Sequence, residues 1–115
     1  MLNIKQRIRL ESEYRPIMKF GRRYYSNYFL MFVLKRSNTS SPSRFGFITS
    51  KKVGDAVVRN RLRRQFREVV RTNISKVTTG FDTVFVVSPK AVGQDFSTLK
   101  GDIEKQLRVS GVVLN

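Results

Sequence analysis

Six arginines stand within the sixteen residues of the segment Ala56–Arg71 (AVVRNRLRRQFREVVR), and valines, a leucine and a phenylalanine lie between them. A guanidinium group forms forked hydrogen bonds to phosphate oxygens and stacks on the flat faces of bases. The chemistry that this segment could perform is therefore the recognition of a polyanion. The same segment must also fold, which raises the question of how the charge and the apolar side chains are separated.

At 100° per residue, the spacing predicts a helix with two opposed faces. Val58, Leu62, Phe66 and Val69 fall on one side, and the other side is almost entirely cationic, with Glu68 as the only counter-charge in the helix. Like charges one turn apart repel, so a solvated surface helix would mix its signs. The pattern favours a nucleic-acid partner. The residues predicted to contact it are Lys51, Lys52, Arg59, Asn60, Arg61, Arg63, Arg64, Arg67 and Arg71.

RNA fits this helix better than DNA. Helix–turn–helix readers of DNA are all-helical and place base-reading side chains at the start of the recognition helix. Here the helix lies between predicted strands, and Asn60 is the only base-reading side chain on its cationic face. Contact with the backbone of a folded RNA is the better match. A second basic and aromatic run, residues 22–28 (RRYYSNY), suits stacking on bases, or equally forms a loop whose tyrosines cover the core.

The residue types argue against self-sufficient catalysis. The chain has no histidine and no cysteine, which are the commonest general bases and nucleophiles, and it therefore has no thiolate zinc site either. The eight carboxylates are scattered along the chain and predict no catalytic or metal-binding group of protein side chains. A metal-dependent nuclease stays open as an alternative, since distant carboxylates can converge in a fold.

The length of the chain and the distribution of its charges indicate what kind of protein carries this helix. The chain has 115 residues, which suits a single RNA-binding domain over residues 1–115. It carries 23 basic and 8 acidic residues, and 18 of the basic but only 4 of the acidic residues lie in positions 1–71. A polyanion is therefore expected on surfaces built by the first two thirds of the chain. The absence of a signal-peptide pattern and of any long apolar run predicts a cytoplasmic protein without membrane contact.

The remaining pattern predicts the elements that must hold the arginine helix. We expect a first helix near residues 8–20, disturbed at Pro16, and a last helix over residues 95–109. Apolar runs predict strands, and the first two of them are expected to form a hairpin. The expected fold is an α/β two-layer sandwich with three helices and a mixed sheet of three to four strands, in the order α-β-β-(β)-α-β-α. The expected strands are residues 28–35, 44–50 and 81–88.

The segment Ser50–Glu68 (SKKVGDAVVRNRLRRQFRE) resembles the signature of the protein subunit of bacterial ribonuclease P, whose hallmark is the triplet Arg59-Asn60-Arg61. The resemblance extends from Arg7 through FGFITSKK to FDTVFVVSPKA and is weakest after about Ala91. It implies a sheet with a left-handed βαβ crossover, against the general preference for right-handed ones.

The resemblance also implies a division of labour. A catalytic RNA with bound Mg²⁺ would cut precursor tRNA and release its 5′ leader, with no catalytic protein side chain and no small-molecule cofactor. The protein would bind the catalytic RNA through its arginine helix and hold the leader in a cleft that contains Tyr14, Met18 and Phe32, where aromatic rings stack on unpaired bases. Simple core packing is the alternative for these three residues. A ribosomal-protein-like or chaperone-like RNA-binding protein, without a role in cleavage, is the alternative for the whole chain.

Overall fold

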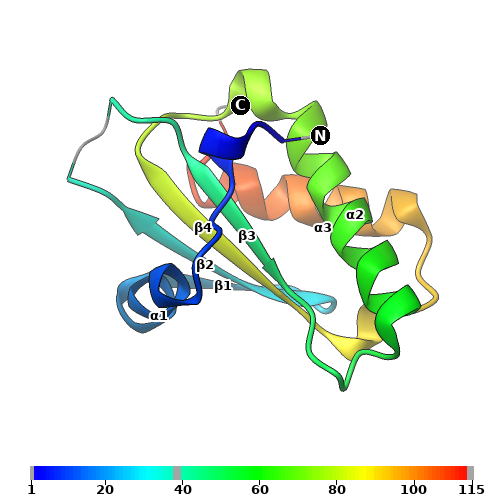
Figure 1. Ribbon diagram of the computed structural model, residues 1–115. Helices are drawn as coiled ribbons and strands as arrows, with labels where there is room; N and C mark the ends of the chain where they lie inside the picture. Colours follow the sequence, from blue (N-terminus) through cyan, green and yellow to red (C-terminus); the bar gives the residue numbers. More distant parts are fainter. Residues whose placement is uncertain (1, 38–39, 114–115) are drawn as a thin grey trace.

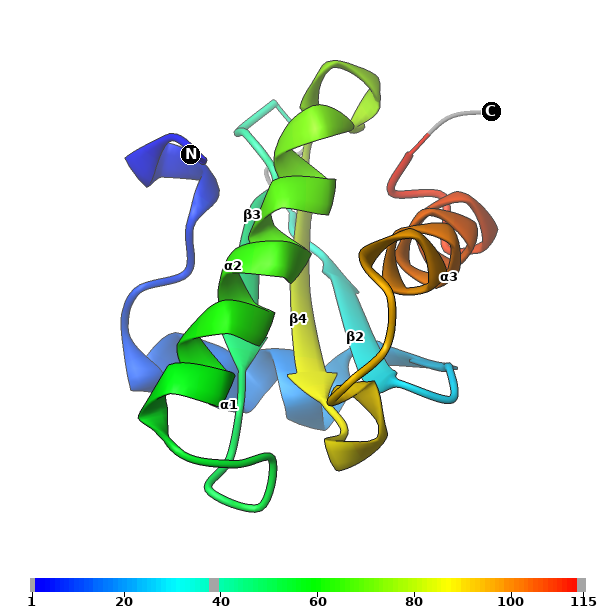
Figure 2. The same cartoon turned by 90° about the vertical axis from the view of Figure 1, so that its right-hand side faces the viewer.

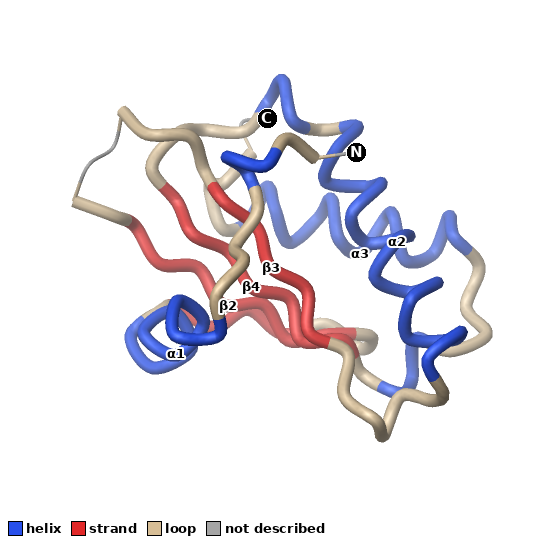
Figure 3. Tube along the Cα trace, in the orientation of Figure 1, coloured by secondary structure: helices blue, strands red, loops and turns tan. Residues whose placement is uncertain are grey.

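A computed structural model describes residues 2–37 and 40–113, which form a four-stranded sheet with helices on both sides (Figures 1 and 3). The order of strands across the sheet is β1-β2-β4-β3. The strands are β1 (Arg22–Tyr25), β2 (Phe29–Lys35), β3 (Arg44–Ile48) and β4 (Phe81–Val87). The helices are α1 (Glu11–Phe20), α2 (Ala56–Thr72) and α3 (Phe96–Val109), and the 3-10 turns are η1 (Ile4–Gln6), η2 (Ile74–Lys76) and η3 (Pro89–Ala91).

Strand β4 takes the central place that the sequence pattern did not predict. It pairs antiparallel with β2 and parallel with β3, so the predicted hairpin between the segments 28–35 and 44–50 is wrong. The reason is that β4 is largely buried on both faces, and such a strand belongs in the middle of a sheet. The βαβ unit β3-α2-β4 connects two strands that are parallel and adjacent in the sheet. In Figure 2, with α2 in front and the strands pointing down, β4 lies to the right of β3, which makes this crossover left-handed.

The helices cover both faces of the sheet. Along β2, Phe29, Met31 and Val33 pack toward α2 and α3, whereas the alternate residues Leu30 and Phe32 pack toward α1. Helix α1 therefore lies on the opposite face from the other two helices (Figure 2), and the two expected layers become three. The expected class, a small mixed sheet with three helices in this order, is confirmed.

Helix α2 begins and packs as its sequence predicts. The side chain of Asp55 accepts a hydrogen bond from the backbone N–H of Val58 at 3.0 Å and caps the first turn. Leu62, Phe66 and Val69 are buried against the sheet and α3. Val70 is buried as well, so the apolar face is wider than the predicted one.

Helix α1 begins at Glu11, three residues later than expected, and continues through Pro16. The carboxylate of Glu13 accepts a hydrogen bond from the backbone N–H of Leu10 at 3.1 Å, which fixes the start of the helix. Residues 12 and 16 are both exposed, so water can replace the backbone hydrogen bond that proline cannot donate.

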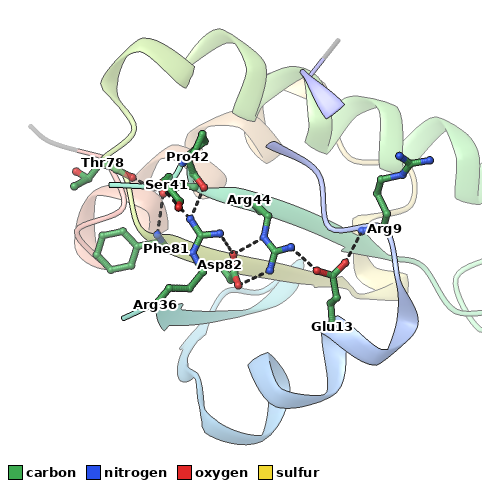
Figure 4. Close-up of polar contacts among 10 residues, drawn as sticks. Arg9, Glu13, Arg36, Ser41, Pro42, Arg44, Thr78, Phe81 and Asp82 are labelled. Atoms are coloured by element: carbon green, nitrogen blue, oxygen red, sulfur yellow. Dashed lines mark hydrogen bonds and ion pairs between the residues drawn. The ribbon is translucent and has the colours of Figure 1, made fainter. Parts of the chain in front are cut away.

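A network of charged side chains ties α1 to the sheet (Figure 4). Asp82 of β4 is buried and accepts hydrogen bonds from Nε of Arg44 at 3.0 Å and from Nη2 at 2.8 Å. Arg36, after β2, forms an ion pair with the same carboxylate at 3.2 Å. Arg44 also pairs with Glu13 of α1. The network therefore fixes one end of α1 relative to β2, β3 and β4.

The Glu13–Arg44 pair makes stability depend on pH. The hydrogen bond from Arg44 lowers the pKa of Glu13 below its ordinary value of 4.5 in the folded protein. The unfolded chain thus binds this proton more tightly, so the stabilisation is present above about pH 4.5 and is lost as the pH falls through the folded pKa. We expect Glu13→Gln to lower the free energy of unfolding by about 0.5–1 kcal/mol near pH 7 and by much less near pH 3.

Urea denaturation at both pH values measures this difference. Glu11→Gln is the matched control, since Glu11 is an exposed carboxylate in the same helical turn. An equal loss of stability at both pH values for Glu13→Gln would contradict the expected role of its charge.

Candidate nucleic-acid interface

The outer surface of α2 carries exposed cations. Asn60, Arg61 and Arg64 are exposed on the helix, and Lys51 and Lys52 are exposed in the turn just before it. We call these five residues the outer surface. Among the described residues, no ion pair involves any of them. The charges of Lys51, Lys52, Arg61 and Arg64 are therefore available to a polyanion, and Asn60 adds an uncharged polar group beside them.

Arg71 differs from the other predicted RNA-binding arginines. Its Nε donates to Glu68 at 2.9 Å, and its Nη2 donates to the other carboxylate oxygen at 2.5 Å. Glu68 lies three residues earlier on the helix, so this is a forked pair within one turn. The pair neutralises much of the charge of Arg71, which we expect to contribute less to RNA binding than the outer surface.

Arg63 and Arg67 turn inward, toward β3. Arg63 donates to the hydroxyl of Thr49 at 2.7 Å and to the side chain of Asn60. The guanidinium of Arg67 lies 5.8 Å from the ring centre of Phe47, and both arginines are half-buried. Burial lowers the pKa of Arg67, and the neighbouring charges of Arg7 and Arg63 lower it further. The cationic face predicted from the sequence is thus divided into the outer surface and an inner pair, Arg63 and Arg67.

Arg63 of the inner pair lines a groove of about 780 Å³ between α1, the end of β3 and α2. Apolar and aromatic side chains lie beside a cationic rim, an arrangement suited to unpaired bases and their phosphates. Two of the predicted cleft residues, Tyr14 and Met18, line this groove. The lining residues are Arg9, Glu11, Tyr14, Arg15, Met18, Lys19, Phe47, Ile48, Thr49 and Arg63.

Phe32, the third predicted cleft residue, is buried between α1 and the sheet and does not line the groove. Its side chain is only 4% exposed, and it packs with Ile17 and Val84 between α1 and the sheet. The guanidinium of Arg23 covers the ring, 5.6 Å from its centre. In this structure Phe32 supports the groove, whereas Phe47 reaches it from the edge strand β3.

Tyr14 connects α1 to the segment before it and to β3. Its hydroxyl donates to the backbone carbonyl of Ile8 at 3.1 Å. Its ring packs on Gly46 of β3 so closely that a Cβ at that position would lie 2.4 Å from the ring carbon Cε1. Burial raises the pKa of Tyr14, while a hydrogen bond from the backbone N–H of Phe47 opposes this shift. The ring is therefore fixed in place at the groove.

Sequence reasoning missed several residues of this site. Phe47 and Thr49 were assigned to a hairpin strand, and the sequence pattern did not say which strand lies at the edge of the sheet. The spacing of Glu11, Arg15 and Lys19 at four-residue intervals does place them on one side of α1, a signal that could have been used. Residues 22–25 form an edge strand and not a loop.

Two further structural findings apply to residues 2–37 and 40–113. No group of three or more histidine, cysteine, aspartate or glutamate side chains gathers as a metal site in these ranges. Within them, no helix is both long and apolar enough to span a membrane.

A small mixed sheet with a left-handed crossover, a cationic helix and an adjacent aromatic groove defines a compact RNA-binding α/β protein. Residues 2–110 match the family model of ribonuclease P, and the chain belongs to this family. It is 44% identical over 101 residues to the ribonuclease P protein component of Fusobacterium nucleatum, a match that covers 87% of this chain and 88% of the relative. The corresponding protein of Clostridium novyi is 33% identical over 107 residues, covering 93% of this chain and 95% of the relative.

Solved structures agree with this assignment. The ribonuclease P protein of Thermotoga maritima superposes with a TM-score of 0.80 at 30% identity, covering 90% of this chain and 96% of that one. The Staphylococcus aureus protein gives a TM-score of 0.86 at 23% identity over 95% of this chain and 98% of that one, which supports the fold. Family membership makes the chain a subunit of an endoribonuclease that matures the 5′ end of tRNA. The function predicted from the sequence is confirmed at this level.

Proposed function

We propose that this subunit connects two RNAs. The outer surface, with the partly buried Arg59 and the inner pair, binds the catalytic RNA, while the groove beside it binds the 5′ leader of precursor tRNA. The observation that supports this most directly is that Arg63 of the arginine helix also lines the groove with Tyr14 and Met18. Two RNAs bound at adjoining surfaces would be held close together.

The protein's contribution in this proposal is electrostatic and geometric. Its arginines reduce the repulsion between the phosphates of the two RNAs, and its groove orients the leader. Mg²⁺ prefers oxygen ligands such as carboxylates, and no group of three or more ligand residues gathers within the described ranges. We therefore assign Mg²⁺ to the RNA partner. We also propose that the complex acts in the cytoplasm.

Reconstitution tests this proposal. The purified chain alone should not cleave precursor tRNA, and together with a bacterial catalytic RNA it should restore cleavage at Mg²⁺ concentrations too low for the RNA by itself. A Mg²⁺ titration with and without the protein measures the effect. If the protein leaves the Mg²⁺ requirement unchanged, the proposal that it bridges the two RNAs fails.

Replacing Tyr14 is expected to weaken binding of the 5′ leader. Stacking of a base on an aromatic ring is worth about 1–3 kcal/mol, so Tyr14→Ala should weaken binding of leader-containing substrate by roughly 5- to 150-fold. The affinity of the reconstituted complex for precursor tRNA with a five-nucleotide leader, compared with leaderless tRNA, isolates this effect. Tyr14→Phe should retain most of the affinity, because it keeps the ring.

Tyr25→Ala serves as the control, since Tyr25 is 69% exposed on β1 and does not line the groove. An equal loss for leader-containing and leaderless tRNA in Tyr14→Ala would show that Tyr14 acts on the fold or on the tRNA body.

A further inference from the structure

The segment that precedes α1, residues 4–10, is fixed along the edge of the sheet (Figure 3). The backbone N–H of Ile8 donates to the carbonyl of Phe45 at 2.9 Å, and Arg7 forms a parallel bridge with the same residue of β3. The hydroxyl of Tyr14 holds the carbonyl of Ile8, and the carboxylate of Glu13 accepts from the backbone of Arg9 at 3.4 Å. This N-terminal segment therefore belongs to the folded domain and holds its side chains in defined positions.

The N-terminal segment places Arg7 beside Arg67 of α2. The two side chains line one small recess of about 60 Å³, together with Tyr14, Gly46 and Phe47. Both arginines are half-buried, and Nε of each is buried without a hydrogen bond to the described part of the chain. Two guanidinium groups held together away from water repel each other, and an anion between them would relieve that repulsion.

Arg9 extends the same cationic path into the groove. Figure 4 shows its guanidinium pointing away from the carboxylate of Glu13, which instead engages Arg44 and the backbone at the start of α1. Arg9 lines the groove together with Arg63. Cations from the N-terminal segment thus lie on both sides of Tyr14, with Arg7 toward α2 and Arg9 toward the groove.

We propose that Arg7 and Arg67 together bind one phosphate of the leader backbone, next to the base that lies in the groove beside Tyr14. This inference rests on the proposed function of the groove. It gives the N-terminal segment a role in substrate binding, and it transfers Arg67 from the surface for the catalytic RNA to the site for the leader. The chemical reason is that two forked guanidinium groups match the paired oxygens of one phosphodiester, in a recess where burial strengthens their attraction.

A neutral linkage in the leader tests this site. Precursor tRNAs carrying one methylphosphonate at successive leader positions are bound to the reconstituted complex. With the wild-type protein, one position should weaken binding by about tenfold or more, which is the range for hydrogen bonds to a charged group, and the other positions should have smaller effects. If no single neutral linkage weakens binding more than the others, the proposal is wrong. This test uses only the wild-type protein, so it does not depend on whether a variant folds.

Arg7→Gln and Arg67→Gln complete the test. Each should weaken binding of the unmodified precursor by about tenfold or more, and each should lose less affinity than the wild-type protein when the sensitive linkage is neutral, because only one of the two guanidinium groups is left to contact it. Arg7→Gln should leave the affinity for the catalytic RNA unchanged, and Arg108→Gln, on the exposed side of α3, should change neither affinity. An equal loss for leaderless tRNA or for the catalytic RNA in Arg7→Gln would overturn the assignment. Failure of the wild-type complex to discriminate leader-containing from leaderless tRNA would instead refute the proposed function itself.

Discussion

Replacing Phe66 with alanine is expected to lower the free energy of unfolding by about 3–5 kcal/mol, the range for deleting a buried aromatic ring. Phe66 is fully buried, and its ring makes edge contacts with Phe29 at 5.6 Å and with Phe85 at 5.9 Å between ring centres. Such pairs add stability beyond the buried area. Domains of this size are stable by only about 5–15 kcal/mol, so the variant should unfold at a much lower urea concentration, measured by circular dichroism.

The opposite face of the same helix provides the control. Arg64 is exposed, and Arg64→Ala should change the free energy of unfolding by about 0.5 kcal/mol or less. Leu62→Ala, on the apolar face, should again cost about 2–5 kcal/mol. Similar losses for Arg64→Ala and Phe66→Ala would contradict the division of α2 into a buried and an exposed face.

Helix α2 could be predicted well because its signals are local. Its cap at Asp55 and its apolar spacing are both contained in the eighteen residues 55–72. The inward turn of Arg67 could not be predicted in the same way. The angle of Arg67 around the helix is clear from the sequence, but the strand and the N-terminal segment that pack against that side come from elsewhere in the chain. The apolar face also extends to Val70, which brings the inner pair closer to the core.

The order of strands in the sheet was the main feature that was predicted wrongly, and this error also affected the prediction of the groove residues. Short-range rules favour a hairpin between successive strands, whereas β4 inserts beside β2 from a position 46 residues further along the chain, as the pairing of Lys35 with Phe81 shows. Only the family resemblance indicated the left-handed crossover, because general rules favour the other hand. Since β3 was not recognised as an edge strand, Phe47 was not recognised as a groove residue. Strand alternation places Phe32 on the α1 side but does not say that the helix covers it.

Removing three cations from the outer surface is expected to have the largest effect on RNA binding. If Lys52, Arg61 and Arg64 each contact one phosphate, replacing all three with glutamine should reduce the slope of log K against log salt by about 2–3. The same relation predicts binding to the catalytic RNA that is about 100-fold weaker near 0.15 M salt and only about 5-fold weaker near 0.5 M. Filter-binding or fluorescence titrations over this range of salt measure both numbers. The decisive result is that the affinities of the wild-type protein and the triple variant approach each other at high salt. Lost packing or misfolding would instead weaken binding at every salt concentration.

A second triple variant separates contact from overall charge. Lys100, Lys105 and Arg108 are exposed on α3, and their replacement with glutamine removes the same number of charges from a surface to which we assign no RNA. Long-range attraction to the whole protein is screened beyond a Debye length of about 8 Å at physiological salt, so this variant should keep its affinity within a few-fold and retain the slope. Equal weakening by the two triples would mean that net charge, and not the outer surface of α2, determines binding. A loss confined to the first triple, with unchanged urea denaturation in both, would place the catalytic RNA on that surface.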